Sequence, residues 1–215
     1  MKKSNYLKNA FIVSIILGAM YLIAVFGIAF DDTVSDYSLI LPINLIVMFV
    51  VMILFNRNGI MSIGYLLAIY FSGFFVEALG VNTGWIFGEY KYLNVMGLKV
   101  FETPLLIGIN WVILIFGVAD ITNRFQVHPL FRVFLGAGLM LIFDVALEPN
   151  AIRMEMWQWK GGNIPTQNYL AWYAISALML IPASKILKRP NPVASSIFLL
   201  QLAFFLVLNL IYSYR

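Results

Sequence analysis

The sequence contains no cysteine and only one histidine, His128, and these two shortages exclude several kinds of site. Without cysteine there can be no disulfide, no cysteine-ligated zinc and no iron–sulfur cluster. A single histidine also excludes a metal site built from several imidazoles. Charged residues are scarce too, at 11% of the 215 residues, and no basic cluster with interleaved aromatics supports nucleic-acid binding.

The chain is instead strongly apolar. Hydrophobic residues make up 62% of it, and the mean hydropathy is +0.89. A soluble domain of this length could not bury so much apolar surface. We therefore expect an all-α integral membrane protein, with a single transmembrane domain over residues 1–215 and a site-bearing core at about residues 60–187.

Seven apolar stretches approach the roughly 20 residues that a transmembrane helix needs. They are Ala10–Phe30, Leu39–Phe55, Ile60–Gly80, Pro104–Ile121, Pro129–Glu148, Tyr169–Leu187 and Ala194–Tyr212. The first follows three lysines, but its apolar run is longer than that of a signal peptide and no small-x-small cleavage site stands out. We expect it to be a retained helix.

The loop charges predict the orientation in the membrane. With the N-terminus inside, the inner segments hold nine basic residues and the outer segments five. The positive-inside rule then favours a multi-pass protein of the cytoplasmic (inner) membrane, with its N-terminus inside and its C-terminus outside. The acidic first loop, with Asp31, Asp32 and Asp36, would lie outside.

The segment Phe143–Trp159, FDVALEPNAIRMEMWQW, is the most informative part of the chain. Asp144 and Glu148 lie four residues apart, on one face of the expected helix and in its last turn. An ionised acid in hydrocarbon is costly, so such acids usually mark a functional site. The alternative for Glu148 is hydration at the interface or a pair with Arg153.

Other polar and aromatic residues are predicted to lie at the same membrane face, beneath two long aromatic loops. These residues are Glu77, Glu102, Asn110, Trp111, Asn168 and Trp172. The order helix, acid, aromatic loop, proline, asparagine, tryptophan occurs twice, which favours a parallel repeat of the third and fourth with the fifth and sixth helices. Asp120 lies at the opposite end, four residues before Arg124, and we expect a structural ion pair there.

The segment Glu77–Tyr92, EALGVNTGWIFGEYKY, resembles the carotenoid biosynthesis hydratase family, which includes carotenoid 1,2-hydratases. The family pattern of an acid, a glycine and T-G-x-x-F-G-x-Y-x-Y matches Glu77, Gly80, Thr83, Gly84, Phe87, Gly88, Tyr90 and Tyr92. Further matches are Pro104, Trp111, Asp144, Glu148, Pro149, Trp157, Trp159, Ile164, Pro165, Asn168 and Trp172. The resemblance covers about the central half of the chain.

The resemblance implies addition of water to the terminal C1=C2 double bond of an acyclic carotenoid, lycopene- or γ-carotene-like, that enters from the lipid membrane. An alkene is a poor base, so the proton donor must be a neutral carboxylic acid in a poorly solvated place. Aromatic faces can stabilise the resulting tertiary cation. A second carboxylate can direct water and take its proton. The reaction needs no cofactor and no metal.

Chemical reasoning on these residues assigns Asp144 as the proton donor, and Glu77 or Glu148 as the base that orients water. The expected substrate-binding residues are Phe87, Tyr90, Tyr92, Asn110, Trp111, Trp157, Trp159, Asn168 and Trp172.

Two other functions fit parts of the pattern. A lycopene-cyclase-like enzyme would use the same protonation, but an internal alkene would capture the cation. A transporter or receptor is the non-enzymatic alternative. The last apolar stretch has no lysine for a retinal Schiff base, and a transporter would be expected to place polar groups or broken helices near the midplane.

Overall fold

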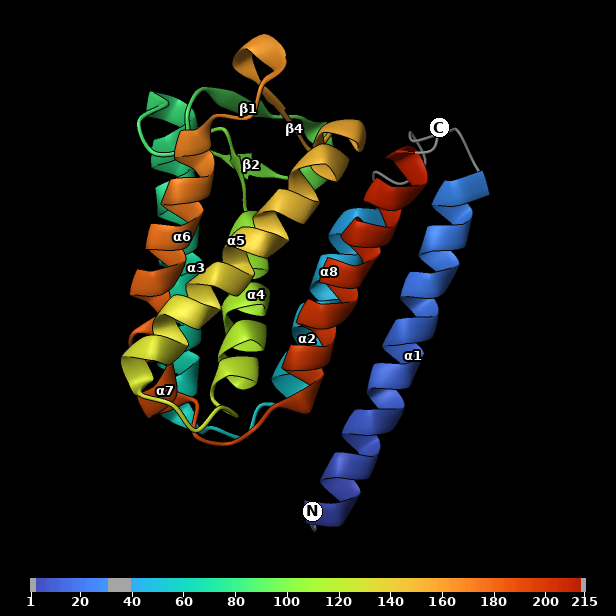
Figure 1. The fold of residues 1–215 in the computed structure, drawn as a ribbon, viewed down its shortest axis with the longest axis vertical. Helices are drawn as coiled ribbons and strands as arrows, with labels where there is room; N and C mark the ends of the chain where they lie inside the picture. The colour runs from blue at the N-terminus through green and yellow to red at the C-terminus, as the bar shows by residue number, and fades with distance from the viewer. Residues whose placement is uncertain (1–2, 31–39, 214–215) are drawn as a thin grey trace.

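The computed structural model describes residues 3–30 and 40–213, and most of them are helical (Figure 1). The helices are α1 (Lys3–Phe30), α2 (Ile40–Leu54), α3 (Ile60–Thr83), α4 (Leu106–Thr122), α5 (Pro129–Arg153), α6 (Thr166–Leu180), α7 (Ala183–Ile186) and α8 (Pro192–Ser213). All seven predicted stretches contain helix. Within the described residues, five spans are long and apolar enough to cross a membrane, one of them formed by α6 with α7, whereas α2 and α4 are shorter apolar helices of 15 and 17 residues. The structure is therefore that of a helical, multi-pass membrane protein.

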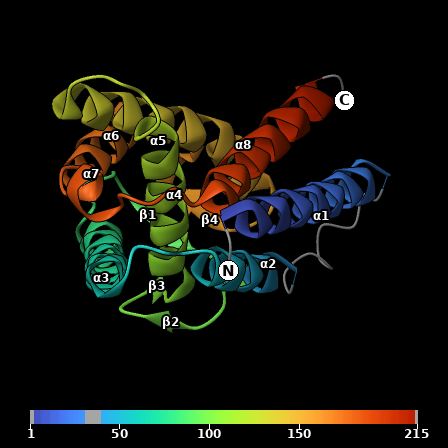
Figure 2. The same ribbon diagram turned by 90° about the horizontal axis from the view of Figure 1, so that it is seen from below.

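Helix α4 lies at the centre of the molecule, as the view along the helices shows (Figure 2). It packs against α2, α3, α5 and α8, and every residue from Asn110 to Asp120 is buried. A helix that is covered on all sides needs apolar residues all round, which explains why α4 has no polar face. Helix α1 lies at the edge and packs mainly against α8.

Two small antiparallel sheets lie at one end of the molecule, where the sequence predicts aromatic loops (Figure 1). In the first, β1 (Tyr90–Tyr92) pairs with β4 (Trp157–Trp159). In the second, β2 (Lys99–Val100) pairs with β3 (Thr103–Pro104). Short 3-10 turns, η2 (Asn94–Met96) and η3 (Lys160–Gly162), complete these connections.

Helix α5 is longer than the sequence predicts. It continues through Pro149 to Arg153, so Asp144 and Glu148 do not lie in its last turn. Proline removes one backbone hydrogen bond from a helix interior but does not have to end it. Here the next residue, Asn150, is tied to α8, because its amide donates to the Phe205 carbonyl at 3.2 Å and to Asn209 Oδ1 at 2.9 Å.

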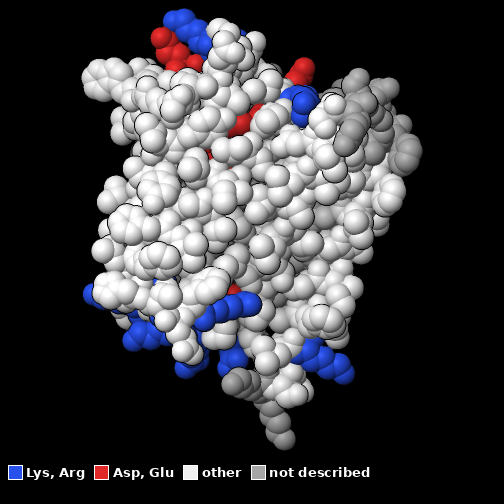
Figure 3. All heavy atoms as spheres, viewed as in Figure 1, with Lys and Arg blue, Asp and Glu red and all other residues white. Residues whose placement is uncertain are grey.

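Charge is distributed unevenly between the two ends of the molecule (Figure 3). The middle carries almost no exposed charge, and the end with the α4–α5 connection carries basic residues. These are Lys8, Arg57, Arg124, Arg132, Lys185, Lys188 and Arg189. The opposite end carries both signs. The predicted acidic loop with Asp31, Asp32 and Asp36 lies outside the described residues.

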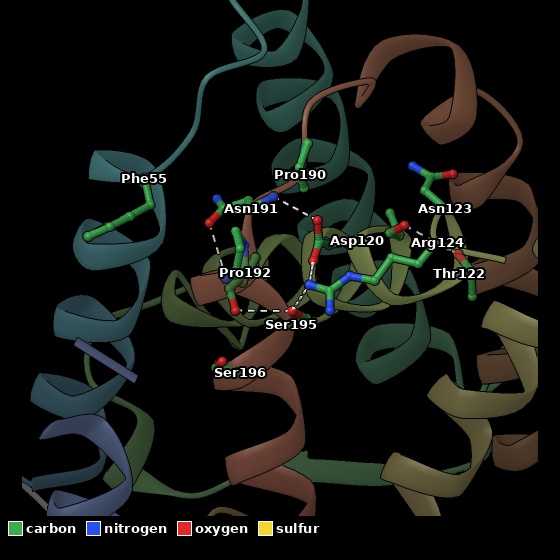
Figure 4. A network of polar contacts seen from close by, with 12 residues as sticks. Phe55, Asp120, Thr122, Asn123, Arg124, Pro190, Asn191, Pro192, Ser195 and Ser196 are labelled. Atoms are coloured by element: carbon green, nitrogen blue, oxygen red, sulfur yellow. Dashed lines mark hydrogen bonds and ion pairs between the residues drawn. The ribbon is translucent and has the colours of Figure 1, made fainter. Parts of the chain in front are cut away.

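The predicted ion pair at the basic end is confirmed (Figure 4). Arg124 Nη2 lies 2.5 Å from Asp120 Oδ2 and 2.9 Å from Ser195 Oγ. Asp120 Oδ1 accepts from the backbone nitrogen of Asn191 at 2.7 Å, and the Asn191 amide donates to the Met52 carbonyl at 3.0 Å. This network joins α2, α4 and the start of α8, so Asp120 has a structural role.

Candidate active site

The motif that follows Glu77 ends α3 and turns the chain back over it. Gly84 caps the helix in the left-handed conformation (φ 70°). A Cβ on Gly80 would lie 2.4 Å from the Phe87 ring, so this glycine lets Phe87 pack on the helix. Gly88 has φ +105° and a Cβ there would lie 2.6 Å from the Pro165 side chain. These glycines therefore place the chain that becomes β1 directly above Glu77.

Strand β1 brings two tyrosine hydroxyls to Glu77. Tyr90 and Tyr92 are two residues apart, so their side chains lie on the same face of the strand. Their hydroxyls donate to Glu77 Oε2 at 2.6 and 2.8 Å, and Trp111 Nε1 on α4 donates to Glu77 Oε1 at 3.1 Å. Burial, assisted by the charge of Glu77, raises the pKa of both tyrosines well above the ordinary value, so they remain protonated donors. Glu77 itself is only 3% exposed.

Strand β4 brings two tryptophan indole groups to Glu148. The Nε1 atoms of Trp157 and Trp159 donate to Glu148 Oε2 at 3.1 and 2.9 Å. The Asn168 amide on α6 donates to Glu148 Oε1 at 3.2 Å. Arg153 instead lies 4.6 Å from the Tyr212 ring centroid, over that ring. Glu148 is 1% exposed, so it is neither hydrated at the interface nor paired with Arg153.

Asp144 has fewer partners than the other two acids. It accepts only one hydrogen bond, from the Asn168 amide at 2.8 Å, and its Oδ1 is buried without a partner among the described residues. Since an ionised carboxylate in such surroundings is far more costly than a neutral one, this geometry favours a protonated Asp144. Asn168 contacts both Asp144 and Glu148 and thus couples them.

The aromatic rings pack together around these acids. Register pairs Tyr90 with Trp159 and Tyr92 with Trp157, while the intervening Lys91 and Gln158 are exposed. The Tyr90 and Trp159 ring centroids are 5.0 Å apart. Beneath the sheet, Trp111 stacks on Trp172 with a centroid separation of 4.5 Å and an interplanar angle of 20°. The sheet therefore covers the acids with aromatic surface.

Two adjoining cavities reach this cluster. The small cavity, of about 20 Å³, lies between Glu77 and Glu148 and is large enough for one water molecule. The large cavity, of about 440 Å³, lies between α1, α2, α4, α5 and α8 and is mostly apolar. Ile107, Asn110, Leu147 and Trp157 line both cavities, so they mark the junction. The exposed side chains Met20, Ile23 and Ile40 line the large cavity, which thus opens on the apolar surface between α1 and α2.

Most of the predicted site residues line the small cavity. They are Glu77, Phe87, Tyr90, Tyr92, Asn110, Glu148, Trp157, Trp159, Asn168 and Trp172. Trp111 and Asp144 lie behind this wall, where each contacts a lining residue. Glu102 does not line the small cavity and is exposed, with φ +58°.

Sequence reasoning missed the contribution of α1, α2 and α8 to the large cavity. Tyr21, Asn44 and Gln201 supply polar groups to its wall. Polar residues in apolar helices are a signal that could have identified these three side chains. Nothing in their spacing indicates that three separate helices bring them together.

Comparisons with known proteins agree with the resemblance seen in the motifs. A family model described as carotenoid biosynthesis protein matches residues 37–214. The bisanhydrobacterioruberin hydratase of Haloarcula japonica is 30% identical over 112 residues, which is 45% of this chain and 36% of that relative. No solved structure matches the chain. Because the family match covers most of the sequence, including the three acids and both strands of the site, the chain belongs to the carotenoid biosynthesis protein family.

Proposed function

We propose that this protein is a carotenoid 1,2-hydratase, which adds water to the terminal C1=C2 double bond of an acyclic carotenoid. The observation that carries the proposal is the small cavity between Glu77 and Glu148, at the end of the large apolar cavity. Its volume fits one water, and its walls combine carboxyl groups with aromatic rings. The name of the Haloarcula japonica relative gives independent support.

The reaction needs one proton donor and one proton acceptor. A proton adds to C2 of the alkene, and the positive charge then lies on the tertiary carbon C1. Cation–π attraction to a desolvated ring stabilises such a charge by about 2 kcal/mol. Water attacks C1 and gives up a proton to a carboxylate, so the product is a tertiary alcohol and the number of protons on the enzyme is unchanged.

We assign the proton donor to the Asp144–Glu148 pair. Asp144 has one hydrogen-bond donor and a buried unpartnered oxygen, so it is the member that holds the proton at rest. Glu148 lines the small cavity, whereas Asp144 lies behind it, so Glu148 is the member that meets the alkene. The proton first passes from Asp144 to Glu148, and Glu148 then delivers it to C2 of the alkene. The proton that Glu77 takes from water returns to the pair at the end of the cycle, which restores the protonated Asp144.

Glu77 is the acceptor for the proton of water. It also lines the small cavity, and its hydrogen bonds to Tyr90 and Tyr92 connect it to hydroxyl groups that can both donate and accept. Asn110 lies at the junction of the two cavities and makes no side-chain hydrogen bond to a described residue. Its amide is free to hold the attacking water.

The polyene reaches the site from the bilayer through the opening between α1 and α2. An apolar cavity of about 440 Å³ is in the usual range for a small-molecule site, and the rest of a long chain can extend into lipid. In this proposal all seven apolar spans cross the membrane as one domain. The two short helices, α2 and α4, cross it where other helices of the protein surround them. The basic end faces the cytoplasm.

Expression in a lycopene-producing host tests the proposal. Hydration increases the mass of the carotenoid by that of water, whereas cyclisation leaves the mass unchanged. We expect a hydrated product that disappears with Glu148→Gln. A cyclised product of unchanged mass would instead establish the lycopene-cyclase-like alternative, and an unmodified carotenoid with well-folded protein would refute both.

A further inference from the structure

Three polar side chains meet in the wall of the large cavity, each from a different helix. Tyr21 on α1 donates its hydroxyl hydrogen to Asn44 Oδ1 on α2 at 3.1 Å. Gln201 on α8 lines the same cavity. The Tyr21 ring packs against Phe204, with centroids 5.5 Å apart, which fixes the hydroxyl in place. We call Tyr21, Asn44 and Gln201 the polar subsite.

The polar subsite has one unused hydrogen-bonding atom. Gln201 is only 5% exposed, and its Oε1 is buried without a hydrogen-bond partner among the described residues. Buried polar atoms in native proteins almost always have a partner, and leaving one unpaired is costly. Gln201 lines the large cavity. Turning its amide over exchanges the positions of Oε1 and Nε2, so a ligand group in that cavity can pair with the amide.

The chemistry of the cavity limits what this ligand group can be. Among the described residues no charged side chain lines the large cavity, so a charged group would have no counter-ion there. A hydroxyl group is neutral and can both donate and accept, so it can pair with the Gln201 amide in either of its two orientations. An unmodified hydrocarbon would leave the amide oxygen unpaired.

We propose that the polar subsite binds a hydroxyl group on the isoprenoid chain of the substrate, at a distance from the reacting double bond. This inference rests on the proposed function, because it assumes that the large cavity holds part of the carotenoid whose end lies near Glu148. Gln201 is then a specificity-determining residue. It favours a chain that already carries a hydroxyl over the hydrocarbon of the same length.

Binding to the purified full-length protein in lipid nanodiscs tests this inference without requiring turnover. The probes are two acyclic carotenes of equal length, one of which carries a tertiary hydroxyl at one end. Quenching of tryptophan fluorescence reports binding, since Trp157 lines the cavity. We expect the hydroxylated chain to bind about tenfold more tightly, as expected for one buried hydrogen bond.

Gln201→Met keeps the length of the side chain and removes both amide atoms. It should abolish the preference while leaving the affinity for the hydrocarbon within about twofold of its original value. Tyr21→Phe, which retains the ring, should reduce the preference severalfold and serves as a second variant if Gln201→Met does not fold. Ser196→Ala is the matched control on α8, because it removes a hydrogen bond to Ser14 outside the cavity and should leave the preference unchanged.

The outcomes separate this inference from the proposed function. The polar subsite would be overturned if the original protein bound the two chains with equal affinity, which is also the result expected if Gln201 merely holds a water. It would also be overturned if the preference survived both substitutions in folded protein. A protein that binds the hydroxylated chain preferentially but adds no water to any carotenoid would refute hydration and leave the subsite standing.

Discussion

The two sides of the proposed active site hold their glutamates in parallel ways but with different chemistry. On each side a three-residue strand supplies two donors to Oε2, and the following helix supplies a third donor to Oε1. Glu77 is held by tyrosine hydroxyls, whereas Glu148 is held by indole nitrogens. A hydroxyl can pass a proton on and an indole N–H can only donate, so the tyrosine side suits water and the tryptophan side suits the cation.

Replacing either glutamate should produce the largest effect and tests whether both sides are needed. Glu77→Gln and Glu148→Gln should each lower the hydration rate by about 10²–10⁴-fold, because each removes one of the two proton-transfer groups. Product formation per folded molecule is the measurement. Glu89→Gln, which changes an exposed acid that pairs with Lys160, is the control and should retain activity. Full activity in either site variant would show that the two sides are not both catalytic.

Replacing the strand residues sharpens the difference between the two sides. Tyr90→Phe combined with Tyr92→Phe keeps both rings but removes the hydroxyls, so water capture should slow by about 100-fold. Non-hydrated alkene isomers, formed when the cation loses a proton instead, should increase. Trp157→Phe combined with Trp159→Phe should lower the rate by only about tenfold and leave the product ratio unchanged. Identical product ratios from the two double variants would contradict the assignment, and chromatography of the carotenoids measures them.

A third substitution tests the ring beneath Glu77. A Cβ on Gly73 would lie 2.6 Å from Trp111 Cγ, and Trp111 both donates to Glu77 and stacks on Trp172. Gly73→Ala should destabilise the protein by about 2 kcal/mol through overpacking and should lower activity as well. Gly138→Ala on α5 is the matched control, because nothing lies within 4 Å of its Cβ position, and it should be close to neutral. Thermal denaturation in detergent measures both.

The smallest effect is expected at the opposite end of the molecule, where the buried acid is structural. Asp120→Asn should lower stability by about 1 kcal/mol, because Arg124 is half exposed and water can replace part of the lost ion pair. Hydration per folded molecule should not change. A selective loss of activity at unchanged stability would show that this end is coupled to the site.

The sequence predicts the helices and the residues of the site better than it predicts how they meet. Acids in apolar helices are costly, so Glu77 and Asp144 stand out directly, and helix direction places them at one end. The pairing of β1 with β4 escapes prediction, because Y-K-Y and W-Q-W are too short for a period-2 pattern to be distinguished from aromatic loops. The extension of α5 through Pro149 depends on the contact of Asn150 with α8, which is a tertiary effect.

Helix α1 lies outside the segment that the family model matches, which begins at residue 37. Yet α1 forms one wall of the large cavity and supplies Tyr21 to it, while contributing nothing to the small cavity. In the proposed function, α1 thus shares chain recognition with α2, α4, α5 and α8, whereas the chemistry lies wholly within the part that the family model matches. Exchanging this single helix offers a route to retarget the enzyme towards other isoprenoids while its acids and aromatic strands stay untouched.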